Sequence, residues 1–342
     1  EFGSRTMIGN GLKATHLVYA VYDNQWNYLT EGTATFQNLV ANVSLRLVNN
    51  KEYNFVFWAS VEGNSYYTLD TTTATVTVSY AGKANDENRD AFFGQLKGLV
   101  VNGTMNESVK LYRPFAQVNW GTNDVAAAKT AGFDISTTGT VVYEAEAYTT
   151  LNLKNGAVDG LQAVTFTAAD LVSNTGDKEQ LETKEHGNYT WLSMNYLLWT
   201  ADQGTLTSNK ITITDDKNQQ VVVSYPNANV RRNWRTNLVG SLLTDQTNIV
   251  VEILPGFADQ HDVELWDGQE KAPAVVNGVY QINDAAELAW FFGKKMDKSA
   301  ILLNDINLAG LTITPINGGI PVSSMSESGR QVFDGNGKTI SN

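Results

Sequence analysis

The sequence predicts a mainly β protein with two antiparallel β-sandwich domains, a short helix and the first rung of a β-solenoid. Short segments in which apolar and polar residues alternate, separated by Gly, Asn, Asp and Thr, dominate the first 255 residues. Many short strands with few helices are typical of sandwiches. A helical pattern then follows near residue 285, and aliphatic residues alternate with Asn, Asp and Gly up to Asn342, as in solenoid rungs.

Half-buried strands are expected wherever apolar residues recur with period two. These segments are Leu17-Tyr19-Val21, Tyr53-Phe55-Phe57, Val76-Val78-Tyr80, Leu151-Leu153, Val164-Phe166, Ile211-Ile213, Val221-Val223-Tyr225 and Ile249-Val251-Ile253. Residues 85–96 (NDENRDAFFGQL) interrupt the pattern and predict a short helix or a capping loop, and residues 125–131 predict one or two helical turns.

The strand pattern predicts five segments along the chain. They are 1–13 as a cloning scar (EFGSR) and N-terminal segment, 14–112 and 113–257 as sandwiches, 258–274 as a linker, and 275–342 as a partial β-solenoid-like segment. In the last segment, Asp284 and Glu287 form a predicted capping box, because an aspartate can accept the N3 amide and a glutamate can answer it. The rung pattern stops at Asn342, so we expect the chain to be part of a longer protein.

Composition excludes several classes of function. The net charge of -12 argues against nucleic acid or an anionic membrane surface as the main partner, since both are polyanions. The absence of cysteine excludes disulfides, thiolate metal sites and cysteine nucleophiles. No apolar run is long enough to span a membrane. Arg231, Arg232 and Arg235 form a local basic cluster, interpreted as a solvated hairpin or a carboxylate-pairing site.

No catalytic, cofactor or metal site is predicted. The three histidines, His16, His186 and His261, are not spaced as metal ligands, and no nucleophile-elbow, P-loop or dinucleotide-binding pattern is present. Two acidic loops (85–90 and 215–216) offer oxygen ligands for calcium but lack the EF-hand register, so solvated loops are favoured.

Residues 109–119 (VKLYRPFAQVN) alternate with period two around Pro114, which predicts a strand that lies at a sheet edge or crosses between two sheets. With five further stretches this segment resembles the Bacteroidales fimbrillins, the subunits of type V pili. The stretches, in the family's order, are ATHLVYAVYDNQWNYL (14–29), KEYNFVFWAS (51–60), NDENRDAFFG (85–94), LYRPFAQVNWGT (111–122), YTWLSMNYLL (189–198) and VRRNWRTNLVGSLLT (230–244).

The resemblance implies two stacked transthyretin-like β-sandwiches in a lipoprotein exported to the outer membrane. It also implies that a trypsin-like protease cuts after an arginine before the first domain, here Arg5. The lost strand would leave an apolar groove. Its candidate lining is the inward-facing apolar residues of the first sandwich, Leu17, Tyr19 and Val21, unless these residues are plain core. A strand from another pilus subunit would fill it, because unpaired backbone groups need partners. The membrane would be contacted only through a removed N-terminal lipid anchor.

The chain departs from the family pattern at its end, where a solenoid-like segment replaces the donor strands. This favours a pilus tip, an anchor or an adhesin over a stalk subunit. The first alternative is a carbohydrate-binding surface lipoprotein, in which exposed Trp26, Trp199 or Trp266 would stack on sugars of a host glycan. The second is the non-catalytic front part of a solenoid polysaccharide-active enzyme. Host protein ligands also fit the first hypothesis, and the fimbrillin resemblance carries over no catalytic residues.

Overall fold

The computed structural model describes residues 9–172, 180–183, 187–245, 249–254, 271–293, 298–304, 306–307 and 332–341. The chain divides into two compact units, Glu1–Phe257 and Ala258–Asn342. Small sheets, largely antiparallel in the first unit, dominate the described structure, which confirms the mainly β fold class. The predicted division between residues 112 and 113 stays a prediction.

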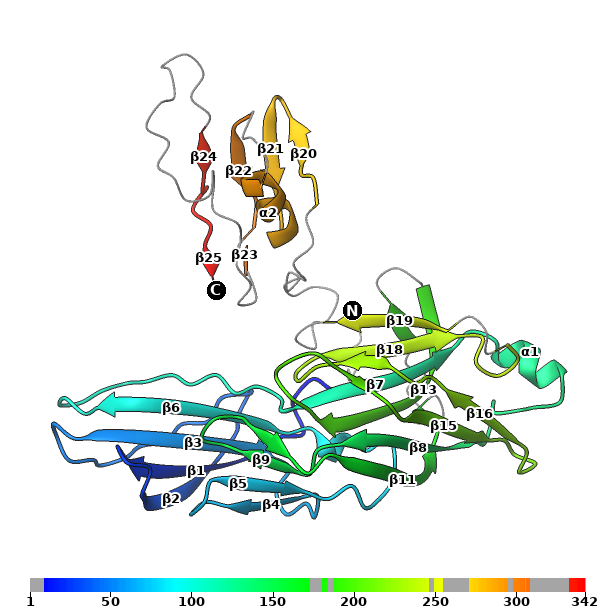
Figure 1. Cartoon of the computed structure of the whole chain (residues 1–342), viewed down its shortest axis with the longest axis horizontal. Helices are drawn as coiled ribbons and strands as arrows, with labels where there is room; N and C mark the ends of the chain where they lie inside the picture. The colour runs from blue at the N-terminus through cyan, green and yellow to red at the C-terminus, as the bar shows by residue number, and fades with distance from the viewer. Residues whose placement is uncertain are drawn as a thin grey trace. The chain divides into compact units, whose positions relative to one another are not determined.

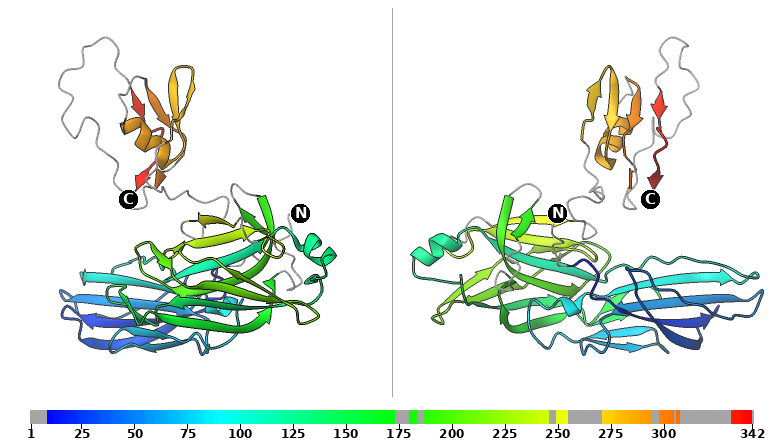
Figure 2. Two further views of the ribbon diagram at one scale, coloured as in Figure 1. Left: turned by 45° about the vertical axis from the view of Figure 1, so that its right-hand side comes forward. Right: turned by 180° about the vertical axis from the view of Figure 1, so that it is seen from behind.

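Four sheets form the body of the first unit (Figures 1 and 2). Sheet 1 has the order β2-β1-β3-β6 and sheet 2 the order β10-β9-β5-β4. Their strands are β1 (His16–Asp23), β2 (Tyr28–Thr35), β3 (Glu52–Ser60), β4 (Tyr67–Asp70), β5 (Thr75–Val78), β6 (Phe92–Val100), β9 (Thr150–Asn152) and β10 (Val158–Asp159).

The other two sheets of this unit are sheet 3, ordered β11-β8-β15-β16, and sheet 4, ordered β12-β13-β7-β18-β19. A small ribbon of β14 (Gly204–Leu206) and β17 (Ala228–Val230) accompanies them. The strands are β7 (Phe115–Thr122), β8 (Thr140–Ala147), β11 (Gln162–Asp170), β12 (Gln180–Thr183), β13 (Gly187–Leu198), β15 (Asn209–Thr214), β16 (Gln220–Ser224), β18 (Arg235–Gly240) and β19 (Val250–Leu254).

The β9–β10 hairpin joins sheet 2 although it follows β7 and β8 in the chain. Val76 of β5 pairs with Leu151 of β9, so segments on both sides of the predicted boundary at residue 112 share one sheet. Both aliphatic side chains are fully buried and belong to the large core that also contains Tyr22 and Trp58 of sheet 1. Burial of apolar area is the main source of folding free energy. The hairpin therefore completes the first sandwich.

Pro114 explains the change of direction between the two sandwiches. Tyr112 still pairs with Phe93 of β6 through both backbone hydrogen bonds. Proline cannot donate to a ladder, and β7 begins directly after it, at Phe115, in the middle of sheet 4. Of the two predicted alternatives, the segment crosses between two sheets.

Two short helical segments interrupt the strands where the sequence predicts helical turns. A 3-10 helix, η1 (Glu87–Arg89), is capped by the Asp86 side chain, which accepts a hydrogen bond from the Asn88 amide. The helix α1 (Val125–Thr130) follows β7.

The second unit combines a helix with parallel strand pairs. In α2 (Ala285–Gly293), the Asp284 side chain accepts the Glu287 amide at 2.8 Å, and the Glu287 side chain accepts the Asn283 amide at 2.8 Å. The helix packs with Tyr280, Ile282 and Leu302 in a core of its own. The strands are β20 (Ala274–Val276), β21 (Val279–Ile282), β22 (Ala300–Leu302), β23 (Ile306–Asn307), β24 (Phe333–Asp334) and β25 (Ile340–Ser341). Strand β22 is parallel to β21 and β24, and β23 to β25, as solenoid rungs require, while the solenoid itself stays a prediction.

Candidate functional site

A buried ion pair at the start of β7 holds the backbone of Gly9. Arg113 Nε lies 2.6 Å from Asp90 Oδ1, and its Nη2 lies 2.9 Å from Asp90 Oδ2. The side chains of Arg113 and Asp90 are 9% and 1% exposed. Arg113 also donates to the carbonyl of Gly9, and Glu87 Oε2 accepts the Gly9 amide at 2.8 Å. Both backbone polar groups of Gly9 are therefore bound. We call the clamp the set of Glu87, Asp90, Arg113 and the neighbouring Tyr196.

The fold assembles this clamp from three separate elements. The 3-10 helix η1 supplies Glu87 and ends at Asp90, residue 113 precedes β7, and β13 supplies Tyr196. Tyr196 donates its hydroxyl to Glu87 Oε1 at 3.0 Å. Burial, with the Asp90 charge beside it, raises the pKa of Glu87 although the Gly9 amide and Tyr196 oppose the shift. The donor on Arg113 and the acceptor on Glu87 together suit an extended peptide backbone.

We predict that Glu87→Gln becomes steadily more stable relative to the original chain as the pH rises above about 4.5. A carboxyl whose folded-state pKa is raised stabilises the fold fully only below its unfolded pKa. That contribution is then lost as the pH rises through the folded-state pKa. Urea unfolding of both proteins at intervals between pH 4 and pH 8 measures the difference. Glu107→Gln, at an exposed position, is the control. A difference that stays flat, or that falls with pH, would contradict the prediction.

The side chains of β7 divide between two faces of sheet 4. Asn195 of β13 lies opposite Val118, and its Oδ1 accepts from the Asn85 amide at 3.4 Å. Asn85 also donates to the carbonyl of Asp170, the last residue of β11. The Val118 side of sheet 4 therefore faces sheet 3. Since successive side chains point to opposite faces, Gln117 and Asn119 lie on the other side, called the outer face of sheet 4.

A row of buried amides crosses this outer face. Asn119 Nδ2 donates to Gln117 Oε1 at 3.2 Å and to Asn237 Oδ1 at 2.9 Å, and these three side chains are 0% exposed. Asn237 Nδ2 donates to Glu252 Oε2 at 3.0 Å. Among the described residues, Gln117 Nε2 and Asn119 Oδ1 have no hydrogen-bond partner. An unsatisfied buried polar group costs free energy. A hydrogen-bond acceptor for Gln117 Nε2 and a donor for Asn119 Oδ1 would therefore be stabilising.

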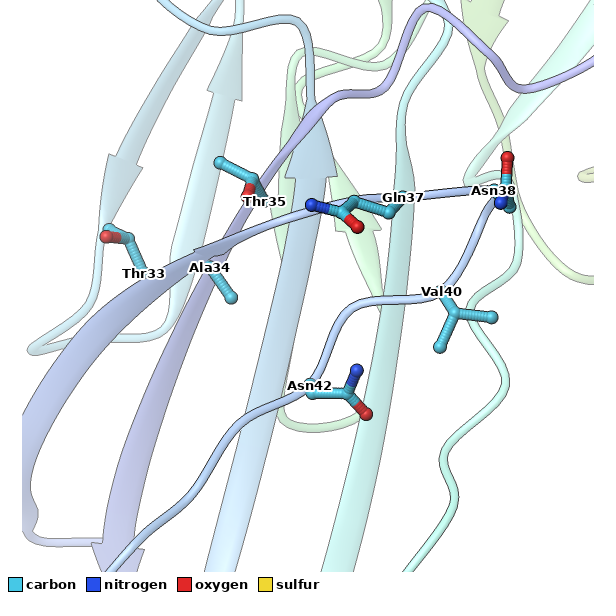
Figure 3. A pocket seen from close by; sticks show the side chains of 7 residues that line it. All are labelled: Thr33, Ala34, Thr35, Gln37, Asn38, Val40 and Asn42. Carbon is cyan, nitrogen blue, oxygen red and sulfur yellow. The ribbon is translucent and has the colours of Figure 1, made fainter.

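A polar groove follows the free edge of sheet 1 (Figure 3). Its volume is about 580 Å³, and one wall is the end of β2, which pairs only with β1 among the described strands. The other wall is the chain after the turn at residues 37–40. The lining residues are Thr33, Ala34, Thr35, Gln37, Asn38, Val40 and Asn42. The polar walls and unpaired strand edge could receive an extended peptide.

The predicted groove residues Leu17, Tyr19 and Val21 do not face the interior of the first sandwich. Alternation sends Ala20 and Tyr22 toward the large core instead. Leu17 and Val21 lie in two small clusters on the opposite face of sheet 1, under residues 36–47, 101 and 111. Strand β1 is also paired on both edges. The expectation that these residues point inward is therefore wrong, while their role in strand acceptance stays a prediction.

Of the predicted stacking residues and the predicted cleavage residue, the structure describes Trp26 and Trp199. Trp26 is half-buried in the β1–β2 loop. Trp199 is 4% exposed and packs edge-on against Tyr148, with ring centroids 5.4 Å apart. Because a stacking platform needs an open ring face, the expected exposure of Trp199 is wrong. Arg5 and Trp266 lie outside the described residues.

The acidic loops use their carboxylates to hold the chain in place. Asp86 accepts from the Tyr66 hydroxyl, and Asp215 Oδ1 accepts the amides of Lys217 and Gln219 at 2.9 and 2.7 Å. In the part of the chain that the structure describes, no cluster of three or more His, Cys, Asp or Glu could hold a metal ion. No helix among the described residues is long and apolar enough to cross a membrane.

Sequence reasoning missed the partners of the buried arginines. Arg232, expected in a solvated hairpin or beside a carboxylate, donates to the carbonyls of Trp199 and Gly156 at 3.0 and 2.6 Å. Burial lowers its pKa to about 10. Arg113, expected only as part of the alternating segment 109–119, forms the clamp. Every residue has a carbonyl, so no sequence signal identifies the acceptors of Arg232. For Arg113, the acidic stretch 86–90 was the one signal that indicated a carboxylate partner.

Comparisons with known proteins describe what the chain is similar to. No curated protein matches it. Solved structures that match include a candidate polysaccharide-binding protein of Bacteroides thetaiotaomicron, at 13% identity and a TM-score of 0.43, covering 72% of this chain and 91% of that one. A fimbrial assembly protein of Parabacteroides distasonis matches at 11% identity and a TM-score of 0.40, covering 73% and 90%. The fimbrial anchor protein Mfa2 of Porphyromonas gingivalis matches at 9% identity and a TM-score of 0.38, covering 70% and 89%.

Other solved structures that match are a candidate adhesin of Bacteroides thetaiotaomicron and a candidate cell adhesion protein of Bacteroides ovatus. One protein family, described as "Family of unknown function (DUF6562)", matches residues 12–287, a range that contains both the clamp and the amide row. The chain belongs to this family of unknown function.

Proposed function

We propose that this chain is a non-enzymatic, fimbrillin-like protein of the cell surface that acts as a pilus tip, an anchor component or an adhesin. It works by strand complementation with other pilus subunits and by contact with a host glycan or protein. A lipid on an N-terminal segment would anchor the chain to the outer membrane until that segment is removed. The roles within a pilus share one requirement, a surface that accepts an extended strand.

The buried amide row on the outer face of sheet 4 carries this proposal. Gln117 Nε2 can donate to a backbone carbonyl, and Asn119 Oδ1 can accept a backbone N–H, which are the groups that they lack among the described residues. The clamp, whose Arg113 lies two residues before β7, binds the backbone amide and carbonyl of Gly9. Main-chain hydrogen bonds are how an added strand gains affinity.

Cleavage after Arg5 would control when the acceptor site becomes available. Removing the residues before the cut would free whatever they cover, while Gly9 would stay attached to Glu87 and Arg113. A subunit would therefore be inert until it is cut and receptive afterwards. The clamp would hold Gly9, the fourth residue of the mature subunit.

We predict that brief trypsin treatment converts the chain into a ladder of dimers, trimers and larger species over several days. Light scattering after size exclusion at rising protein concentration measures the masses. Arg5→Ala should stay monomeric after the same treatment. The matched control Arg46→Ala, which removes an exposed arginine, should form the ladder. Monomers in every sample, or a ladder that survives Arg5→Ala, would contradict strand complementation triggered at Arg5.

The second unit supports the alternative in which the sandwiches carry a longer solenoid. Its strands β22 and β24 pair in parallel although their sequences lie about 30 residues apart, as successive rungs do. The capped helix α2, which follows β20 and β21, packs on β22 and on Phe333 of β24. A solenoid that extends past Asn342 would be the place for polysaccharide contact, with or without catalysis there.

A further inference from the structure

The loop between β1 and β2 is a rigid turn built around Asp23. Asp23 Oδ1 accepts the amides of Gln25 and Asn27 at 2.8 and 2.9 Å, and its Oδ2 accepts from Asn27 Nδ2 at 2.8 Å. The backbone closes the loop twice, from the Trp26 amide to the Asp23 carbonyl and from the Asp23 amide to the Asn27 carbonyl. These five hydrogen bonds within the loop hold Trp26 in place before any ligand binds.

Trp26 occupies a backbone conformation that favours glycine or asparagine. Its φ is +64°, in the left-handed region, where a large side chain is strained. Asparagine would fit both the turn and this φ at lower cost. Strained positions of this kind are concentrated at functional sites. The indole is therefore held here in spite of the backbone preference.

The indole belongs to an aromatic cluster at the end of the first sandwich. The ring of Tyr22 lies 5.4 Å from that of Trp26 and 6.2 Å from that of Tyr28. Tyr22 is fully buried, whereas Tyr28 is 37% exposed and Trp26 is half-buried. Lys154, from the β9–β10 turn, places Nζ 5.2 and 5.6 Å from the centroids of the Tyr22 and Trp26 rings. The exposed part of the cluster combines flat apolar rings with polar groups.

Hydrogen-bonding groups surround the rings. Glu31 of β2 accepts from the Thr71 hydroxyl, and the Thr71 carbonyl accepts from the Tyr22 hydroxyl. Asp23 and Glu31 place carboxylates near the rings, and the chain carries a net charge of -12. An acidic ligand would be repelled by these charges. A ligand with apolar C–H faces and neutral hydroxyls fits better, since the rings pack on the former and the carboxylate accepts from the latter.

We propose that the cluster of Trp26, Tyr28, Glu31 and Lys154 is a binding site for neutral hexose units of a polysaccharide. The inference rests on the proposed adhesive function, whose glycan ligand it narrows to uncharged sugars. Trp26 and Tyr28 stack on the sugar ring, and Glu31 and Lys154 bind its hydroxyls. The site lies on sheet 1 and the neighbouring turns, apart from the clamp and the amide row, so sugar binding and strand complementation are separable.

Native gels that contain a dissolved polysaccharide test the site with the full chain. The neutral probes are galactomannan, xyloglucan and laminarin, and the acidic probe is polygalacturonate. We expect retardation by at least one neutral probe and none by polygalacturonate. Trp26→Asn and Tyr28→Ala should each weaken the apparent affinity about tenfold or more, as for aromatic residues that dominate an interface. Trp234→Ala removes a half-buried indole elsewhere and should leave the affinity unchanged.

The choice of Trp26→Asn provides a control for correct folding. Asparagine suits the left-handed φ, so the melting temperature of the Trp26→Asn variant should equal or exceed that of the original chain. Its trypsin-induced ladder should also persist, which separates failure of the sugar site from failure of the proposed function. Absence of retardation in all three neutral gels would overturn the inference. Equal retardation of the Trp26→Asn variant, or retardation by polygalacturonate alone, would overturn it too.

Discussion

Replacement of Arg113 by methionine is expected to lower the free energy of unfolding by about 3–5 kcal/mol. The substitution leaves the buried Asp90 carboxylate without the guanidinium that donates a hydrogen bond to each of its two oxygens. A buried charge without a partner is among the costliest defects in a folded protein. It also removes the donor to the Gly9 carbonyl, so the start of the described chain loses one of its attachments.

The double variant Arg113→Met/Asp90→Leu provides the sharpest comparison. Replacing both charges by apolar groups of similar size removes the desolvation problem, so most of the lost stability should return. Urea unfolding followed by circular dichroism measures all three proteins. Lys210→Met, which breaks the half-exposed pair with Glu144, is the control and should cost about 1 kcal/mol or less. A single variant no worse than this control would show that the clamp contributes little to stability.

Trp120→Ala is expected to cost about 3–5 kcal/mol, as for other large aromatic side chains truncated in a core. Trp120 is fully buried on the side of β7 that faces sheet 3. Its neighbours across the strands are Ser193 of β13 and Leu238 of β18. The rigid backbone of three paired strands limits how far the surroundings can close the cavity, so the loss should be near the upper end.

Trp120→Phe separates the cavity from the polar group of the indole. Among the described residues, Trp120 Nε1 has no hydrogen-bond partner, so removing it relieves a desolvation cost. The phenylalanine variant should therefore lose clearly less stability than the alanine variant. Denaturant midpoints and slopes for both report the comparison. Equal losses would mean that the indole N–H is satisfied in solution, and a loss below about 1 kcal/mol for alanine would contradict full burial.

Local features of the fold could be predicted from the sequence. The alternation of Leu17, Tyr19 and Val21 identified the first strand because side chains on a strand have period two. Asp284 and Glu287 predicted the start of α2, since capping depends on groups three residues apart. Pro114 predicted a segment at a sheet edge or one that crosses between two sheets, and the segment crosses. Each of these features depends on neighbours in the chain, which a sequence displays directly.

Features that depend on distant partners could not be predicted. Alternation shows that Leu17 and Tyr22 lie on opposite faces, but it does not say which face meets the larger core. Trp199 looked like an available ring because its partner Tyr148 lies some 50 residues earlier. The amide row joins β7 to β18, more than 100 residues apart. Only the folded topology brings such groups together.

The late position of the β9–β10 hairpin in the chain has a consequence during protein synthesis. Sheet 1 is complete once β6 has left the ribosome, but its inner side chains Tyr22 and Trp58 then lack the part of their cover that comes from Leu151. At about 5–20 residues per second, the wait from β6 to β10 lasts several seconds. The nascent first sandwich therefore exposes apolar side chains for that time, and the two sandwiches complete their folding together.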